Sequence, residues 1–288
     1  MATLFNRVTG LLIIEVRESN PNGDPDQEGE PRQRDNFGLI TGVSFKRKVR
    51  DLIEDKSGPV WETIAAEMKI TDRPGDFRIL ESRGRNRDEI KRLKKEEFQR
   101  RYWDARVFGT TFLESMKGDK ATKPDDVEHF IRNGAVQFGN AVSVAPVEIT
   151  RLTNTNKSGV QEGKDRGMAP LADRRVVHGV YCMPFFVNPT AAVKSGCKSE
   201  DIELLKRILP LAYRHTASHI RSGVEPRHIW YVEHTSPLGS CSDFALLDAL
   251  KPQFHENGPS TAWSQYTVPS ALPESLVGKV TSCVDLAA

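Results

Sequence analysis

The sequence predicts an α+β fold built on an antiparallel sheet, and three observations support this prediction. A strand-like apolar run at residues 8–16 is followed by a loop and an amphipathic helix. Further strand-like segments at 136–149, 176–187 and 229–232 are separated by helical segments or by a loop. Between residues 150 and 175 the chain makes one long excursion in which apolar residues nearly vanish.

The first strand is expected at residues 8–16, and its nearly continuous apolar centre indicates a central position in the sheet. The Pro, Gly, Asn and Asp residues of 20–26 cannot extend a strand, so they predict a loop. A helix follows, with Ser44 as its expected N-cap and Gly58-Pro59 as its stop signal. Its apolar residues share one face by their spacing: Phe45, Val49, Leu52 and Ile53.

The charge pattern of this helix is unusual. Lys46, Arg47 and Lys48 fall in the expected first turn, where the helix dipole disfavours a cation by about 0.3–1 kcal/mol. An anion bound at the helix start would explain this placement, and a solvated basic face explains a single basic run equally well. Arg32 and Arg34 belong to the same loop-to-helix junction. Together these cations favour a site for a polyanion.

The middle of the chain predicts further helices and strands. Residues 61–69 predict a short amphipathic helix. Residues 83–101 predict a surface helix whose acids and bases are mixed at i, i+4 spacing. Residues 136–149 predict a strand or a pair of strands, with a bend at Gly139-Asn140.

The excursion at 150–175 has neither a helical nor a strand period, and a loop of this length is usually functional or disordered. Because strand-like composition returns at 176–187, we interpret it as an excursion from a hairpin. Folded back on itself at ~3.3 Å per residue, it would reach about 40 Å, far enough to contact a neighbouring subunit. An unstructured surface loop is the alternative.

The last third of the chain predicts a helix beginning at Ser199 and kinked at Pro210. Basic residues follow where they would suit the C-terminal end of the helix dipole: Arg214, His215, His219 and Arg221. A late strand is expected at 229–232 and a short helix at 243–250. The tail beyond Lys251 shows little pattern.

Composition excludes several classes of protein. A net charge of +2 and a pI of about 8.3 do not indicate a nucleic-acid binder, so only the local clustering of cations does. No apolar run approaches the roughly 18 residues that span a bilayer, and the N-terminus lacks a signal-peptide layout. The four cysteines are widely spaced, which favours free thiols in a reducing compartment over a zinc or redox motif. We therefore expect a cytoplasmic protein with no membrane partner.

Residue chemistry predicts a binding protein and not a catalyst. The loop after the first strand is acidic, with Asp24, Asp26, Glu28 and Asp35, but Pro21 and Pro25 break the geometry of a calcium loop. His178 lies within a strand-like run and is interpreted as a structural histidine. The sequence contains no phosphate-binding loop, nucleophile elbow or dinucleotide fingerprint. No metal or cofactor is expected.

One set of motifs is specific enough to suggest a family. Asn20-Pro-Asn-Gly-Asp-Pro-Asp26, Pro31-Arg32 and Lys46-Arg-Lys-Val-Arg50 closely resemble the signature of the backbone subunit of type I CRISPR interference complexes. The type I-C member of that family, within the RAMP superfamily, is the best match. The resemblance continues in three more segments: Asp104-Ala-Arg-Val-Phe-Gly109, Gly134-Ala-Val-Gln-Phe-Gly139 and Arg174-Arg-Val-Val-His-Gly179.

The resemblance implies a single RRM-like (ferredoxin-like) domain over residues 1–288, called the palm. It also implies two insertions, helical fingers placed at 61–133 and a long thumb hairpin placed at 150–175. In the family, copies stack into a helical filament along the CRISPR RNA and leave it open for pairing with target DNA. Such a subunit assembles with other Cascade subunits, has no catalysis of its own, and works with a recruited helicase–nuclease.

The resemblance also implies roles for individual residues. The RNA groove would be lined by amides, a hydroxyl and cations of the opening stretch: Asn20, Asn22, Arg32, Arg34, Ser44, Lys46, Arg47, Lys48 and Arg50. Arg166 and Met168 are candidates for the intercalating tip of the thumb. The alternative function is a RAMP-type endoribonuclease that cuts RNA with acidic residues of the loop after the first strand, namely Asp24, Asp26 and Asp35.

Overall fold

The computed structural model describes residues 5–110, 133–157 and 168–288. Arg166 and part of each predicted insertion, 61–133 and 150–175, lie outside the described residues. Within the described ranges, no helix combines the length and the apolar character needed to cross a membrane.

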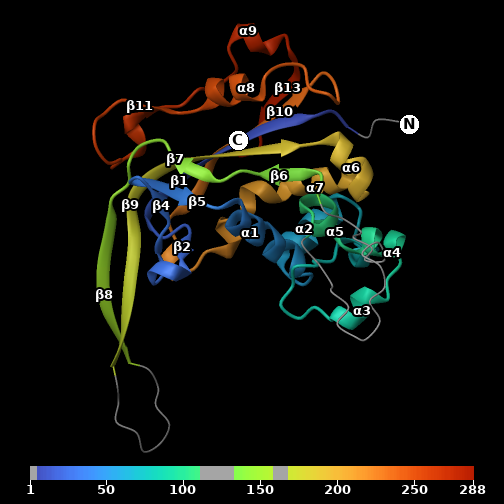
Figure 1. Cartoon of the computed structure of the whole chain (residues 1–288), viewed down its shortest axis with the longest axis horizontal. Helices are drawn as coiled ribbons and strands as arrows, with labels where there is room; N and C mark the ends of the chain where they lie inside the picture. Colours follow the sequence, from blue (N-terminus) through green and yellow to red (C-terminus); the bar gives the residue numbers. More distant parts are fainter. Residues whose placement is uncertain (1–4, 111–132, 158–167) are drawn as a thin grey trace, which may run out of the picture.

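An antiparallel sheet runs through the centre of the molecule (Figure 1). Its strands follow the order β13 (Val280–Asp285), β10 (Val224–His234), β1 (Val8–Ser19), β9 (Met168–Val187), β7 (Ala141–Ser143), β5 (Phe37–Ile40) and β4 (Gln33–Arg34). Two further strands, β6 (Val136–Phe138) and β8 (Ile149–Lys157), pair with β9. Neighbouring strands are antiparallel throughout, so the predicted α+β class and antiparallel sheet are confirmed.

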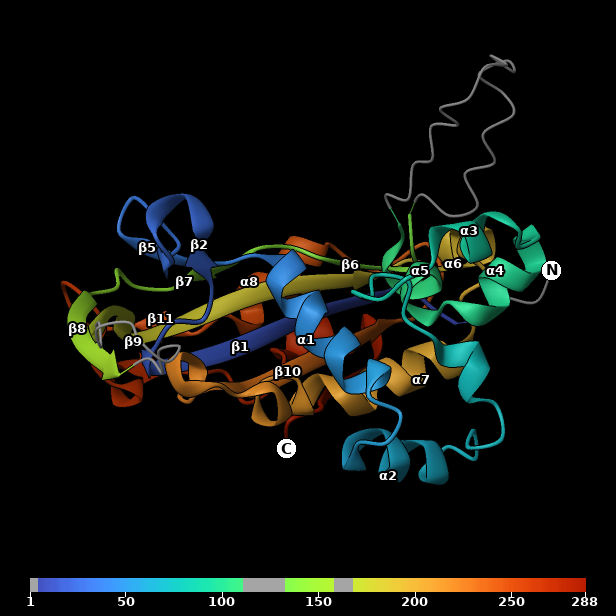
Figure 2. The ribbon, with the colours of Figure 1, turned by 90° about the horizontal axis from the view of Figure 1, so that it is seen from below.

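Strand β1 is buried on both faces, as its apolar centre predicts. Leu12 and Ile14 belong to the main core, together with residues of α1 (Gly42–Glu54), α2 (Pro59–Glu67) and α7 (Ser199–Ile208). Leu11 and Ile13 belong to a second core under the C-terminal segment. Side chains alternate between the faces of a strand, so β1 lies between two packed layers. Figure 2 shows α1, α2 and α7 on one side of the sheet.

Helix α1 begins earlier than the sequence suggests. Its N-cap is Thr41, whose hydroxyl oxygen accepts a hydrogen bond from the Ser44 backbone N–H at 3.2 Å. The prediction that Ser44 is the N-cap is therefore wrong. Since the helix starts at Gly42, the basic residues 46–48 lie in its second turn, and the dipole argument does not apply to them.

The chain between α1 and β6 forms several short elements. After α2 come η2 (Pro74–Phe77), α3 (Arg87–Lys91), α4 (Lys95–Arg101) and α5 (Trp103–Phe108). The prediction of a single surface helix over 83–101 is wrong, because the chain turns between α3 and α4. The turn lets Ile90, Leu93 and Phe98 pack into a small core of their own.

Two buried ion pairs join α5 to the helices that cover the sheet. Arg50 of α1 lies 2.9 Å from an Asp104 carboxylate oxygen, and Asp104 also accepts hydrogen bonds from the backbone N–H groups of Leu80 and Glu81. Arg106 lies 2.6 Å from the carboxylate of Asp201 in α7. The chain from η2 to α5, called the helical segment below, is therefore attached to both α1 and α7 by charged groups that are almost fully buried.

Strands β8 and β9 form a hairpin whose described pairs run from Ile149–Val176 to Lys157–Met168. The hairpin extends away from the sheet in Figure 1, while the second half of β9 is a central strand. Short pieces of the opening loop lie near its base, namely β2 (Gly23–Asp24), η1 (Pro25–Gln27) and β3 (Glu30–Pro31). The described ends of the excursion thus agree with the hairpin interpretation.

After β9 the chain forms α6 (Pro189–Ser195) and then α7. The prediction that Pro210 kinks α7 is wrong, because α7 ends at Ile208 and is followed by η4 (Leu209–Leu211). The basic residues after position 213 therefore do not belong to the last turns of α7. They lie in η5 (Arg214–Thr216) and η6 (His219–Arg221), in the connection to β10.

The C-terminal segment covers the other face of the sheet. Helix α8 (Asp243–Leu250) has the predicted bounds, and the strands at 136–138 and 141–143 flank the predicted bend. The tail without pattern forms five further elements: β11 (Gln253–Phe254), η7 (Trp263–Gln265), β12 (Tyr266–Thr267), α9 (Glu274–Val277) and β13. Strand β13 pairs with β10 and forms one edge of the sheet.

Candidate nucleic-acid interface

The two asparagines of the opening motif hold the loop in front of α1. Asn22 Oδ1 accepts hydrogen bonds from the Thr41 backbone N–H at 2.8 Å and from its hydroxyl at 3.0 Å. Asn20 is buried, and its Nδ2 donates to the Gly29 carbonyl oxygen at 2.7 Å. In this way the loop is folded back on itself, and the start of α1 is fixed by a residue from outside the helix.

Two lysines of α1 retain unpaired charge. Lys46 is partly buried, and burial together with nearby Arg50 lowers the pKa of its amine to about 8. Burial also lowers the pKa of Lys48, and Arg221 adds to this effect. Within the described residues, neither lysine forms an ion pair with a carboxylate. The Lys46 amine lies 5.5 Å from the ring centroid of Phe108.

The two arginines of α1 bind acids of the chain itself. Arg47 lies 2.7 Å from Asp51 and 3.2 Å from Glu54, and it donates a hydrogen bond to the Glu81 carbonyl oxygen. Arg50 is buried against Asp104. Of the four cations of this helix, the two arginines have acidic partners in the described structure and the two lysines have none. The prediction that Arg47 and Arg50 bind RNA is not tested by this arrangement.

The remaining cations of the opening stretch lie on the connection between β3 and α1. Arg32 is partly buried and forms an ion pair with Asp24 at 3.1 Å. Arg34 is exposed at the end of β4, next to a tight turn in which Asp35 and Asn36 have φ values of 52° and 67°. Such left-handed residues are typical of a two-residue hairpin turn. The turn presents Arg34 to solvent.

The connection between α7 and β10 adds cations that sequence analysis assigned to a helix end. The Ile220 carbonyl oxygen accepts a hydrogen bond from the Asn20 backbone N–H at 2.7 Å, which places this connection beside the opening loop. Arg221 lies close enough to Lys48 to lower its pKa. His219 lies 3.2 Å from Arg175 and 3.7 Å from Asp173 on the hairpin. The connection therefore bridges α1 and the base of the hairpin.

Acids of the opening loop anchor this hairpin. Arg151 of β8 lies 2.7 Å from Glu30, and Arg174 of β9 forms an ion pair with Glu28. Arg174 also donates a hydrogen bond to the Gln27 carbonyl oxygen at 2.9 Å. The pairs fix the base of the hairpin relative to the loop. Met168 is the first residue of β9, where it pairs with Lys157.

The other acids of the loop serve local structure. Asp24 accepts a hydrogen bond from the Asp26 backbone N–H at 3.1 Å and pairs with Arg32. Asp26 and Asp35 are exposed. The described residues contain no group of three or more His, Cys, Asp or Glu side chains that could hold a metal ion. The prediction for His178 is confirmed, since it is buried between Ser260 at 2.7 Å and Glu15 at 3.1 Å.

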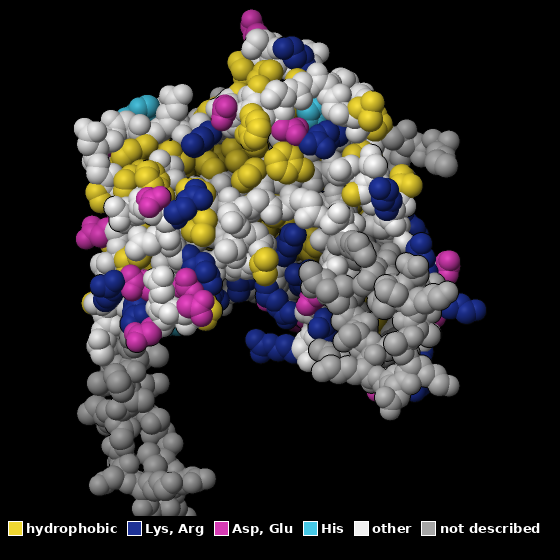
Figure 3. Space-filling view, viewed as in Figure 1, with side chains coloured by type: hydrophobic (Ala, Val, Ile, Leu, Met, Phe, Trp, Pro, Cys, Tyr) yellow, Lys and Arg dark blue, Asp and Glu magenta, His cyan; other side chains and the backbone are white. Residues whose placement is uncertain are grey.

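The space-filling view shows where cationic side chains gather on one face of the molecule. In Figure 3, Lys and Arg side chains gather in the hollowed underside of the molecule, between the hairpin and the helical segment. In the upper part of the same view, hydrophobic side chains form patches and the Lys and Arg side chains are scattered. A basic hollow next to a projecting hairpin is a suitable surface for a polyanion that passes along the molecule.

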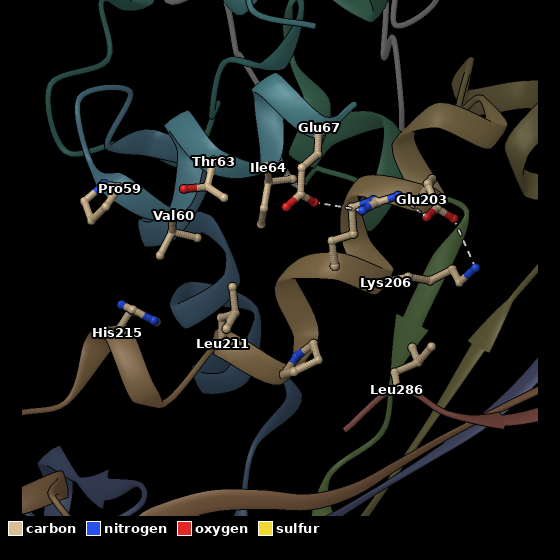
Figure 4. Close-up of a pocket in the computed structure, with 12 residues that line it drawn as sticks. Pro59, Val60, Thr63, Ile64, Glu67, Glu203, Lys206, Leu211, His215 and Leu286 are labelled. Carbon is tan, nitrogen blue, oxygen red and sulfur yellow. Dashed lines mark hydrogen bonds and ion pairs between the residues drawn. The ribbon is translucent and has the colours of Figure 1, made fainter. Parts of the chain in front are cut away.

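A groove of about 630 Å³ lies between α2 and α7 (Figure 4). Its floor is apolar and includes Val60, Ile64 and Leu211. The cations at its rim are paired, because Arg207 lies 3.0 Å from Glu67 and Lys206 lies 3.0 Å from Glu203. Since these cations are neutralised by acids, the groove is less suited to a polyanion than the hollow under α1.

Comparison with known proteins identifies the family. The family model described as CRISPR-associated protein Cas7 matches residues 6–271. The chain belongs to this family. The match includes both the opening loop with α1 and the connection between α7 and β10, so both sides of the basic hollow lie within it.

Similar proteins carry related descriptions. The protein named CRISPR-associated protein Cas7 from Haloferax volcanii is 27% identical over 246 residues, which cover 81% of this chain and 72% of that protein. A solved chain of a CRISPR RNA-guided surveillance complex aligns with a TM-score of 0.44 at 15% identity, over 80% of this chain and 70% of that one. A chain of a pre-nicking surveillance complex aligns with a TM-score of 0.45 at 14% identity, over 80% and 78% of the two chains.

Proposed function

We propose that this chain is the RNA-binding backbone subunit of a type I-C CRISPR interference complex. Membership of the CRISPR-associated protein Cas7 family supports a role in CRISPR defence. The resemblance of residues 20–50 to the type I-C signature supports the subtype. The observation that carries the RNA-binding role is the pair Lys46 and Lys48, two partly buried cations without a carboxylate partner in the described structure.

The proposed architecture is a single RRM-like palm over 1–288, with fingers at 61–133 and a thumb at 150–175. The order β10-β1-β9-β7 supports the palm, with α1 between β1 and β7 in sequence and α7 between β9 and β10. Together these elements follow the β-α-β-β-α-β pattern of ferredoxin-like folds. The short helices α2 to α5 support the fingers, and the β8–β9 hairpin supports the thumb.

In this proposal the guide RNA is held by its backbone. A guide must keep its base edges free for target DNA, so its phosphates and 2′-hydroxyls are the groups left for the protein to bind. Lysine amines suit this task because they attract phosphates without reading sequence. The RNA then passes through the hollow under α1, between the hairpin and the helical segment.

Neighbouring copies of the chain are proposed to bind along the same RNA. Head-to-tail contacts between copies produce an open helix when the rotation between them does not close into a ring. The resemblance adds other Cascade subunits, target DNA and a recruited helicase–nuclease as partners, in the cytoplasm. The subunit itself is proposed to be a scaffold without catalysis. The ion pair of Asp24, one of the three acids of the alternative ribonuclease, with Arg32 supports this part of the proposal.

The test compares two double variants with matched chemistry. Lys46→Gln with Lys48→Gln removes the two unpaired cations of α1, and Lys251→Gln with Lys279→Gln removes two exposed lysines of the C-terminal layer. A hydrogen bond to a charged group contributes about 1.5 kcal/mol, so each lost α1 lysine should weaken binding of single-stranded RNA about tenfold. Filter binding across a salt series should also show the log–log slope falling by about 0.7 per lost contact.

The control variant should bind RNA as the wild type does. The wild-type protein should also copurify with RNA of discrete length, because copies on a guide protect a defined stretch. Equal affinity and equal slope for the two double variants would refute the assignment of α1 as the RNA-binding element.

A further inference from the structure

Arg221 is an unusual arginine in this protein. Most arginines of the described structure form ion pairs with carboxylates, whereas Arg221 has none there. Arg34 also lacks an acidic partner in the described structure, but it is exposed, while Arg221 is partly buried. The Nε atom of Arg221 is buried and has no hydrogen-bond acceptor among the described residues. A buried donor on a charged group is costly unless an acceptor satisfies it.

The surroundings of Arg221 increase this cost. Lys48 of α1 is its cationic neighbour: burial is the main cause of the lowered pKa of Lys48, Arg221 lowers it further, and Asp51 acts in the opposite direction. Lys48 is itself partly buried and has no ion pair in the described part of the chain. Two like charges held together in a partly desolvated place destabilise a fold, and an anion bound between them removes the repulsion.

The connection that carries Arg221 is fixed by contacts on two sides, which restrict the position of its backbone. The Arg221 backbone N–H donates to the Ser218 carbonyl oxygen at 2.8 Å, and the Ile220 carbonyl oxygen accepts from Asn20 at 2.7 Å. On the other side His219 contacts the hairpin through Arg175 at 3.2 Å. The backbone at Arg221 is therefore held between the opening loop and the base of the hairpin, and its side chain is near Lys48 of α1.

We propose that Arg221 and Lys48 together bind one phosphodiester of single-stranded RNA, on the side of the hollow formed by the connection between α7 and β10. This inference rests on the proposed RNA-binding function and adds a second element to the α1 surface. A guanidinium can donate two parallel hydrogen bonds to phosphate oxygens, while the lysine acts as a point charge. The RNA backbone is then held from two elements that are distant in sequence.

The experiment uses the full chain and a single-stranded RNA of about 30 nucleotides, with Arg221→Gln as the test variant. Arg214→Gln is the matched control, because Arg214 lies in the same connection but is exposed and paired with Glu225 at 2.8 Å. Arg221→Gln should lose about tenfold in affinity near 0.1 M salt, with a log–log salt slope smaller by about 0.7. Arg214→Gln should change neither quantity by more than about twofold.

A charge-conserving variant separates binding from folding. Arg221→Lys keeps the charge, so it should keep the wild-type salt slope even though it loses the bidentate hydrogen bonds to the phosphate. Wild-type affinity and slope in Arg221→Gln, with weakened binding in the double variant of Lys46 and Lys48, would overturn this inference and leave the proposed function standing. Failure of the wild-type protein to bind the RNA would overturn both.

Discussion

Substitution of Asp104 should lower the free energy of unfolding, because it breaks the ion pair that attaches the helical segment to α1. Asp104 is fully buried, lies 2.9 Å from Arg50, and accepts hydrogen bonds from Leu80 N–H at 2.7 Å and Glu81 N–H at 3.2 Å. Asp104→Ala would leave the Arg50 guanidinium buried without its counter-ion. Breaking a buried ion pair from one side costs about 3–5 kcal/mol, and the two orphaned backbone donors increase that cost.

The double variant Arg50→Met with Asp104→Leu distinguishes the charge from the backbone contacts. It removes both charges, so the loss of stability should shrink to about 1–3 kcal/mol, the cost of the two unmet donors at Leu80 and Glu81. Urea unfolding followed by circular dichroism measures each free energy of unfolding. A loss below ~1 kcal/mol in Asp104→Ala, or an equal loss in the double variant, would refute the view that this ion pair fastens the segment. RNA-binding tests should therefore leave Arg50 unchanged, because its substitution perturbs the fold.

Three further predictions concern Lys46 and the acids of the opening loop. Lys46→Met should raise the free energy of unfolding at pH 7 by about 1 kcal/mol, because burial disfavours the protonated amine. The pKa of Lys46 is lowered from 10.5 to about 8 in the folded state, so the wild type becomes more stable as the pH rises between those two values. The difference in the free energy of unfolding between Lys46→Met and the wild type should therefore be smaller at pH 10 than at pH 7. RNA affinity should fall between pH 7 and pH 9 in the wild type, as Lys46 loses its proton, and should change less in Lys46→Gln; an identical pH profile would contradict a phosphate contact at Lys46. A complementary target RNA should stay uncut with Mg²⁺ present, and Asp24→Ala, Asp26→Ala and Asp35→Ala should not change that; a metal-dependent ladder that disappears in one of these variants would instead support the ribonuclease.

Local patterns predicted much of the fold because their causes are local. The apolar run of β1 and the capped helix at 243–250 both appear where expected. The start of α1 could not be predicted from propensity alone, since Thr41 and Ser44 are both good N-cap residues. The choice depends on Asn22, which binds Thr41 from across the loop.

Other features depend on contacts between distant parts of the chain. Arg50 looks like one more exposed cation of the basic run until Asp104, more than fifty residues away, buries it. The edge strand β13 contains only partly buried and exposed residues and is specified by pairing with β10. The sequence could not single out Arg221 for the same reason, because its proposed role depends on nearby Lys48 and on the absence of an ion pair with a carboxylate among the described residues. The one sequence feature that could have indicated a separate basic segment was Pro210, because a proline tends to end a helix and the basic residues after 213 follow it.

The most direct test of RNA binding in the hollow is ultraviolet cross-linking of the RNA-bound protein, followed by mass spectrometry of the linked peptides. The account predicts cross-links in residues 20–50, which include Lys46 and Lys48, and in residues 219–222, which include Arg221. It predicts none in residues 251–279, which contribute to the core on the opposite face of the sheet. Cross-links concentrated in 251–279, with none in the first two segments, would contradict the account.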